Sequence, residues 1–258
     1  MLTAKNGEEV CGLTIFKQRF ILCFLSLICI LQSQTAFAME GRPYFEFGMG
    51  YRTGDFGTSI TSSLYDASST AGYIASDYDF GVTAPFLFLT NESDDQADHQ
   101  NGIGDIIARA GLVLVREKDK GFSLYGDLSV KIPTANSDKG LGTGETDYGA
   151  LLILSRSFET VKLSVMGGYF IVGDTPVQDY NNLHLYGIGV SKIFDRTGLT
   201  VYFEGRRSLI PGSQDPKNIN FGIFHVINAN YSIRGNILYG LNDGGPDYGF
   251  NFGLSRWF

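Results

Sequence analysis

Charged side chains recur at every second position in segments whose alternate residues are apolar. In segment 121–133, Asp127 and Lys131 share one face, whereas Leu128 and Val130 lie on the other. Residues two apart on a β-strand point to the same side. A carboxylate and an ammonium group would therefore line a polar interior, where they could form ion pairs and contact a passing solute.

The same alternation places polar residues of both signs on the expected inner faces of other segments. A ring of one sign would select an ion of opposite charge. Mixed signs favour ion pairs that narrow or plug the interior, so we expect a narrow passage. The alternative is that these residues only fill and brace a closed structure. The predicted lining residues are Glu46, Asp105, Arg109, Asp127, Lys131, Lys162, Glu204, Arg206 and Arg234, with Tyr202 and Asn236 beside them.

Catalysis and metal binding find little support in the sequence. A membrane lipid hydrolase needs a base within reach of a nucleophile, and no His-x-Ser pairing lies near His184 or His225. His99 lies in the polar segment 91–104, whose acidic residues could gather Ca²⁺ through hard oxygen ligands. Their spacing matches no known loop signature, so a solvated acidic loop is favoured. No enzyme activity, cofactor or metal site is expected.

The element that must position such residues is clearest at the end of the chain. Counting back in twos from Phe258 gives Arg256, Leu254, Phe252, Phe250 and Tyr248, and the intervening residues are mostly small or polar. This is the repeat of a strand with lipid on one side and a wet lumen on the other. The terminal Phe258 resembles the signal by which barrel assembly machinery recognises outer-membrane β-barrels.

About ten residues of alternating character, divided by turn residues, recur through the chain, as tilted membrane strands require. A soluble sandwich would alternate similarly but would lack the terminal aromatic signal. We predict an all-β antiparallel barrel of about twelve strands, with ten as the next choice. The predicted strands are 44–52, 57–67, 79–90, 104–117, 121–133, 146–157, 160–173, 182–194, 198–209, 217–229, 231–242 and 247–258.

The lengths of the links provide an independent check on this topology. Short and long links alternate, as expected if the short ones are periplasmic turns and the long ones are outer loops. The link 67–79 breaks this rule, because it is long where a short turn is expected.

The beginning of the chain predicts export. Lys17 and Arg19 precede an apolar run over 20–31, and Ala36-Phe37-Ala38 follows. These are the three zones of a secretory signal peptide, and the apolar run is too short for a membrane-spanning helix. We predict a signal peptide over 1–38 and a single barrel domain over 39–258, located in the outer membrane of a Gram-negative bacterium.

Removal of residues 1–38 would leave an acidic chain without cysteine. All three cysteines lie in this segment, and the remaining 220 residues carry 17 basic and 25 acidic side chains, a formal charge of −8. The mature chain could therefore form no disulfide framework. Its acidity disfavours nucleic acid as a partner.

Several segments carry a family resemblance. They are Gly102-Ile103-Gly104-Asp105, Lys131-Ile132-Pro133-Thr134, the stretch Lys139–Tyr148 and the stretch Gly240–Asp247. Together, over about residues 100–258, they resemble the outer-membrane barrel family named for transport in the phenol meta-cleavage pathway. Ala135 stands where the family usually has Gly. The resemblance implies passage of small aromatic or apolar molecules, although a shared barrel does not fix its cargo.

The stretch from Lys131 to Asp147 has the composition of an outer loop of fixed shape. Proline cannot donate to a ladder and ends the strand, and alternate glycines allow close backbone approach. The loop could fold inward as a constriction or form a hairpin tip at the surface. The constriction candidates are Pro133, Gly140, Gly142, Gly144 and Asp147.

Two functions follow as hypotheses. The first is an outer-membrane channel through which small solutes, including aromatic or apolar ones, diffuse passively. The second is a closed structural or surface-interaction barrel. The expected partners are outer-membrane lipid, the barrel assembly machinery and, for a channel, a small-molecule solute.

Overall fold

The computed structural model describes residues 41–56, 60–93, 96–175 and 179–258. Its strands are β1 (Arg42–Gly54), β2 (Thr61–Ile74), β3 (Tyr78–Ser93), β4 (Gln96–Ile103), β5 (Ile106–Val115), β6 (Ser123–Ile132), β7 (Asp147–Phe158), β8 (Val161–Ile171), β9 (Leu183–Phe194), β10 (Thr197–Arg206), β11 (Lys217–Asn228), β12 (Tyr231–Gly240) and β13 (Tyr248–Trp257), with a single helical turn α4 (Glu117–Lys120). The predicted signal peptide lies outside the described residues.

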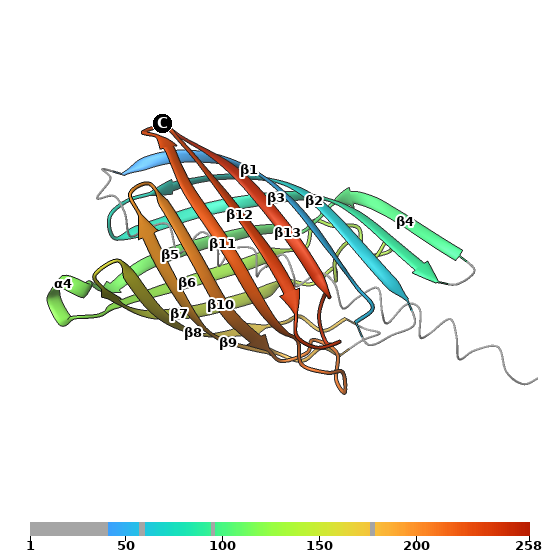
Figure 1. The fold of residues 1–258 in the computed structure, drawn as a ribbon. Helices are drawn as coiled ribbons and strands as arrows, with labels where there is room; N and C mark the ends of the chain where they lie inside the picture. Colours follow the sequence, from blue (N-terminus) through green and yellow to red (C-terminus); the bar gives the residue numbers. More distant parts are fainter. Residues whose placement is uncertain (1–40, 57–59, 94–95, 176–178) are drawn as a thin grey trace, which may run out of the picture.

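Within those residues the strands form a closed, twelve-stranded antiparallel barrel. Each strand pairs with its sequence neighbours, and β1 pairs with β13 to close the ring, which aligns Tyr44 with Trp257. Elements β4 and β5 count as one barrel strand interrupted at Gly104–Asp105, because both pair with β3. Figure 1 shows the strands tilted around a common axis, with the C-terminus and α4 at the same end.

Two expectations about the first half of the barrel are wrong. Strand β2 continues to Ile74, and the Ala75 N–H donates to the Tyr78 carbonyl at 2.8 Å, so the link to β3 is a short turn. The prediction of a strand over 57–67 missed the second half of β2, whose serines and threonines weaken the alternation, although the strand pairs along its length with both β1 and β3. The link alternation therefore holds here as well.

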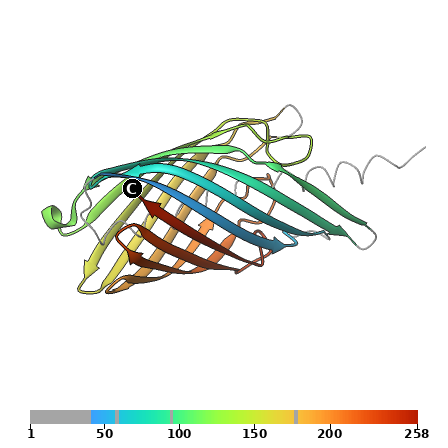
Figure 2. The same ribbon diagram turned by 90° about the horizontal axis from the view of Figure 1, so that it is seen from above.

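The described residues of the polar segment 91–104 are also not an open loop. Residues 91–93 and 96–103 belong to the β3–β4 hairpin, in which His99 pairs with Thr90. This hairpin extends beyond the other strands at the loop end of the barrel, as Figure 2 shows. Backbone pairing with β3 supplies the order that the polar side chains did not predict.

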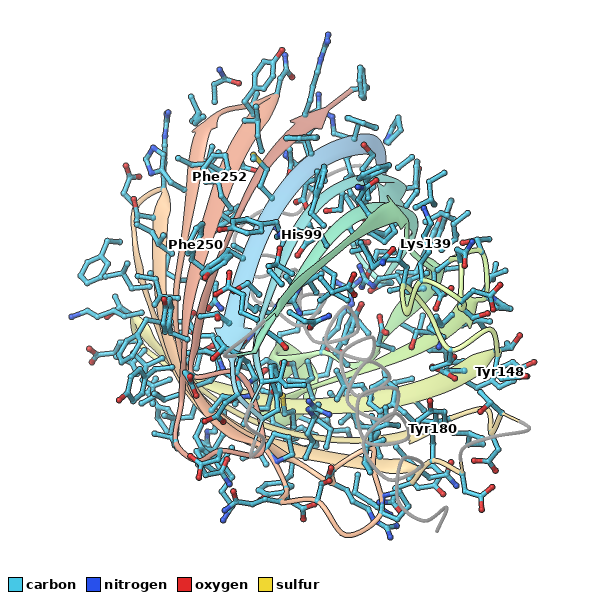
Figure 3. All side chains as sticks on the ribbon, turned by 90° about the vertical axis from the view of Figure 1, so that its right-hand side faces the viewer. His99, Lys139, Tyr148, Tyr180, Phe250 and Phe252 are labelled. Carbon is cyan, nitrogen blue, oxygen red and sulfur yellow. The ribbon has the colours of Figure 1, made fainter. Side chains whose placement is uncertain are left out.

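The outward face is an apolar surface bounded by two rows of aromatic side chains. Tyrosines lie toward the loop end and mainly phenylalanines toward the turn end; exposed examples are Tyr65, Tyr148, Tyr169, Tyr186, Tyr239 and Tyr248, and Tyr78, Phe80, Phe122, Phe158, Phe194 and Phe258. About ten residues of tilted strand separate the rows, which matches an apolar band about 25 Å tall. Figure 3 looks along the barrel and shows Tyr148 outside the ring of strands.

Alternate residues of the strands face the interior and are buried or half-buried. In β6, Leu128 is 65% exposed whereas Asp127 and Lys131 are 8% and 1% exposed. The predicted faces of this strand and of the last strand are therefore observed. No helix in the described ranges is long and apolar enough to span a membrane.

Candidate functional site

The inner wall carries its charges in ion pairs between neighbouring strands. Arg109 of β5 lies at the centre of one group: its Nε donates to Asp127 Oδ2 at 3.1 Å, and its Nη2 lies 2.5 Å from Asp79 Oδ1. The Tyr125 hydroxyl accepts from Arg109 Nη2 at 3.0 Å and donates to Asp79 Oδ2 at 2.6 Å. The four side chains form one buried network over β3, β5 and β6.

A second group bridges the closure of the barrel. Arg234 of β12 donates through Nε to Glu46 Oε2 of β1 at 3.0 Å, and Ser255 Oγ donates to the same oxygen at 2.7 Å. Gly253 lies between them on β13, and a Cβ there would meet Arg234 Nε at 2.7 Å. The absence of a side chain at Gly253 therefore lets the guanidinium group cross the middle strand.

Lys131 forms the third group, at the loop end of the barrel. Its Nζ lies 2.7 Å from Asp147 Oδ2 and 3.5 Å from Asp105 Oδ2, and it donates to Thr143 Oγ1 at 2.9 Å. Asp105 Oδ1 also accepts the backbone N–H of Ala135 at 3.0 Å. Asp105 therefore holds the start of the loop between β6 and β7 at Ala135, and Lys131 holds its end at Thr143 and Asp147.

This loop folds inward. Residues 140–143 are buried, and the Leu141 side chain, 0% exposed, packs against the inward-facing Leu64, Leu87 and Leu89 of β2 and β3. Gly140 and Gly144 have φ of 66° and 79°, conformations that favour glycine. The loop thus turns its middle part over the inner faces of β2 and β3.

The other constriction candidates divide between the surface and the interior. A Cβ on Gly142 would lie 2.7 Å from the Ala135 Cβ, so this glycine is required by close packing. Asp147 is 1% exposed and accepts the backbone N–H of Gly173 at 3.1 Å. Pro133 and Gly144 are exposed at the loop surface.

The remaining lining candidates also face inward. Glu204 and Arg206 of β10 are buried, and Lys162 of β8 is half-buried. Sequence reasoning missed Asp79, the second residue of β3, and the pair in which Arg52 Nη2 lies 3.0 Å from Asp66 Oδ1. Both carboxylates lie within the predicted strands 57–67 and 79–90, so an alternation count along those strands could have found them.

An apolar strip on the inner wall was also missed. It runs along the inner faces of β7 to β10, is joined by Ile107 of β5, and includes side chains of the loops after β8 and β10. Its buried residues are Ile107, Leu151, Met166, Phe170, Val172, Tyr180, Leu183, Leu185, Tyr202, Leu209 and Ile210. The interior of a water-filled membrane barrel is usually polar, so this strip distinguishes the lumen from that of a general aqueous pore. Burial raises the pKa of the Tyr180 phenol in the loop after β8.

The histidines have ordinary partners. His225 Nδ1 lies 2.8 Å from Thr197 Oγ1, and His99 Nδ1 lies 3.1 Å from Thr90 Oγ1. The ring of His184 packs against that of Tyr169, with centroids 4.9 Å apart. Among the residues described, no group of three or more His, Cys, Asp or Glu could hold a metal ion.

The solved structures that the chain resembles are outer-membrane barrels. An outer membrane channel from Pseudomonas putida F1 matches with a TM-score of 0.72 at 14% identity, covering 85% of this chain and 96% of that one. The translocator domain of the autotransporter NalP from Neisseria meningitidis matches with a TM-score of 0.57 at 14% identity, covering 92% and 95%. The NanC porin matches with a TM-score of 0.51 at 12% identity, covering 82% and 98%. These similarities show a shared fold.

The fold and the apolar outer band place the protein in the outer membrane of a Gram-negative bacterium, surrounded by lipid. No curated protein matches the chain. A family model does match, over residues 43–258. It covers the whole barrel, including the region before residue 100 where the sequence suggested no resemblance. The chain therefore belongs to the family described as "Putative MetA-pathway of phenol degradation".

Proposed function

We propose that the protein is a channel through which small uncharged solutes of apolar or aromatic character diffuse passively across the outer membrane. The observation that carries this proposal is the apolar strip on the inner wall of β7 to β10. Transfer of a solute with an apolar body from water to such a wall costs little free energy, because the apolar surface that it buries offsets the lost hydration.

The paired charges support an uncharged solute. Arg109 forms ion pairs with Asp79 and Asp127, Arg234 pairs with Glu46, and Lys131 lies between two carboxylates. Paired charges along a wall create a weaker field in the lumen than a ring of one sign would. We therefore expect weak discrimination between anions and cations.

The loops support a narrow passage rather than a wide pore. The loop between β6 and β7 inserts Leu141 over β2 and β3, and the loops after β8 and β10 add Tyr180 and Leu209 to the apolar strip. A twelve-stranded barrel is also intermediate between side-chain-filled barrels and the wider porins. The inward loops would then form the constriction of the channel.

The comparisons agree with this proposal. One structure with the same fold is an outer membrane channel, and another is a porin. The description of the matched family names phenol degradation. An aromatic solute is consistent with that description.

The burial of the interior side chains favours one alternative, a closed barrel with a structural or surface role. Lys131, Glu204 and Leu141 are all at most 2% exposed. A closed barrel would pass no solute.

Liposome swelling distinguishes the two functions. The purified protein is inserted into liposomes and challenged with a phenyl glycoside and with a disaccharide of similar mass, both of which cross lipid slowly. The channel proposal expects faster swelling with the phenyl glycoside than with the disaccharide. Swelling at the rate of protein-free liposomes for both solutes would favour the closed barrel.

A further inference from the structure

The inner wall of β11 and β12 contains two side-chain amides that bond to each other and leave one nitrogen and one oxygen atom without a hydrogen-bond partner. Asn220 of β11 and Asn236 of β12 are 2% and 5% exposed. Asn236 Nδ2 donates to Asn220 Oδ1 at 3.2 Å, which leaves Asn220 Nδ2 and Asn236 Oδ1 without a hydrogen bond. The pair therefore presents one free donor and one free acceptor.

A buried donor or acceptor without a partner costs about 1–3 kcal/mol. A buried pair of amides that only braced the barrel would be expected to satisfy these atoms within the protein. The guanidinium Nε of Arg206, on the adjacent β10, also lacks a partner. The unsatisfied amide atoms of Asn220 and Asn236 point to a ligand that completes them, whereas Arg206 lies four residues beyond Tyr202, the residue aligned with Asn220.

Space lies beside these amides. Gly222 faces the interior two residues after Asn220, and it aligns with Asn236 across the β11–β12 ladder. A Cβ added there would meet Asn236 Oδ1 and Thr200 Cβ at 3.7 Å and nothing nearer. The wall at Gly222 therefore has room for a methyl-sized group in van der Waals contact with Asn236 Oδ1.

An apolar neighbour completes the arrangement. Tyr202 of β10 aligns directly with Asn220 across the ladder and belongs to the apolar strip together with Leu185 and Leu209. A molecule with its polar end at the amides would lay its apolar body against this strip.

We propose that Asn220 and Asn236, with Gly222 and Tyr202, form a binding site for a neutral molecule whose apolar body ends in a group that both donates and accepts hydrogen bonds, such as a carboxamide or hydroxyl. The proposal rests on the proposed function, because it assigns a solute-recognition site within that channel. Its test is a binding measurement that needs no conductance.

The probe is benzamide, whose amide offers a donor to Asn236 Oδ1 and an acceptor to Asn220 Nδ2. Binding to the folded protein in lipid nanodiscs is measured by saturation-transfer NMR. The double variant Asn220→Leu/Asn236→Leu removes both amides and keeps their approximate size. Loss of two hydrogen bonds should weaken benzamide binding about 5- to 150-fold.

The same variant separates a binding site from a structural brace. Replacement of both partners of a hydrogen bond by apolar groups of similar shape is neutral or stabilising. We expect the unfolding temperature of the double variant, read from heat-modifiable gel mobility, to be unchanged or raised while binding falls. A lowered unfolding temperature with unchanged benzamide binding would assign the amides a structural role and overturn the proposal.

Two further variants complete the design. Gly222→Val keeps both amides but fills the space beside them, and it should weaken binding as well. Asn91→Leu makes the same substitution at a buried asparagine of β3, which belongs to a different hydrogen-bonded pair with Ser62, and should leave binding unchanged. Absence of benzamide binding to the unmodified protein would also overturn the proposal. Binding without any solute flux would preserve the site and reject the channel.

Discussion

At the scale of single residues, the interior is organised by charges that depend on one another. Lys131 is 1% exposed between Asp105 and Asp147. Removal of one partner from a buried ion pair leaves the remaining charge without compensation, which typically costs about 3–5 kcal/mol. Lys131 also contacts Thr143, so its loss would release the loop between β6 and β7.

Lys131→Met should therefore lower the unfolding temperature and increase solute flux through the folded fraction. The unfolding temperature is read from heat-modifiable gel mobility, and flux from liposome swelling normalised to folded protein. Lys139→Met, at an exposed position of the same loop, is the control and should change neither quantity. An increase in flux for both variants would show that the loop does not depend on the buried ion pairs.

The two faces of a strand respond differently to charge. Leu128 is 65% exposed on the outer surface of β6. Leu128→Arg should destabilise the barrel by about 2–4 kcal/mol relative to Leu128→Ala, because an arginine at the bilayer midplane must leave water. Denaturant titration of both variants in lipid vesicles measures the difference. Equal stabilities would contradict the assignment of this face to lipid.

At the scale of the elements, alternation predicted the strands well wherever one face is apolar. It placed only the first half of β2, whose Ser62, Ser63, Ser68 and Ser69 weaken the contrast between faces, and it missed β4, where polar residues occupy both faces. Backbone pairing between strands is not encoded in local contrast. What orders β2 and β4 is their pairing with β3, which sequence patterns do not report.

The inward loop was one of two readings that the sequence left open. Glycines at 140, 142 and 144 indicated a fixed shape, but the contact of Leu141 with Leu64 and Leu87 depends on the tertiary fold. The apolar strip was missed for the same reason. The loops after β8 and β10 place Tyr180 and Leu209 against side chains of several strands, and these contacts exist only in the folded barrel.

Deletion of residues 139–144 should increase flux without preventing folding, because outer loops tolerate change better than strands. Leu141→Ser is the matched point variant, and it should have a smaller effect in the same direction. The folded fraction is measured by heat-modifiable mobility and flux by liposome swelling. Unchanged flux in the deletion variant would mean that the loop does not constrict the passage.

The final strand carries a prediction about assembly. The Phe258 N–H donates to the Pro43 carbonyl at 3.0 Å, and its ring lies 4.7 Å from the Arg256 guanidinium carbon. Deletion of Phe258 removes little of the barrel, yet it should reduce the amount of folded protein in the outer membrane of cells if this residue is the assembly signal.

Refolding of the same deletion variant into lipid vesicles is the control. Normal refolding together with poor assembly in cells would support recognition of Phe258 by the assembly machinery. Normal assembly in cells would contradict it.

At the scale of the whole molecule, the outside and the inside of the barrel follow different rules. The outside is an apolar band between two aromatic rows, which the alternation predicted from local sequence. The inside combines paired charges, an apolar strip and amides, and these come from strands far apart in the chain. The membrane location was therefore predictable, whereas the arrangement of the interior required the closed barrel.

Single-channel recording of the purified protein in planar bilayers tests most directly whether this barrel conducts solutes. We expect small unitary currents with weak preference between anions and cations, because the wall charges are paired. Protein that is folded by heat-modifiable mobility and inserted in the bilayer, but gives no unitary current and no solute uptake, would contradict the channel and favour the closed barrel.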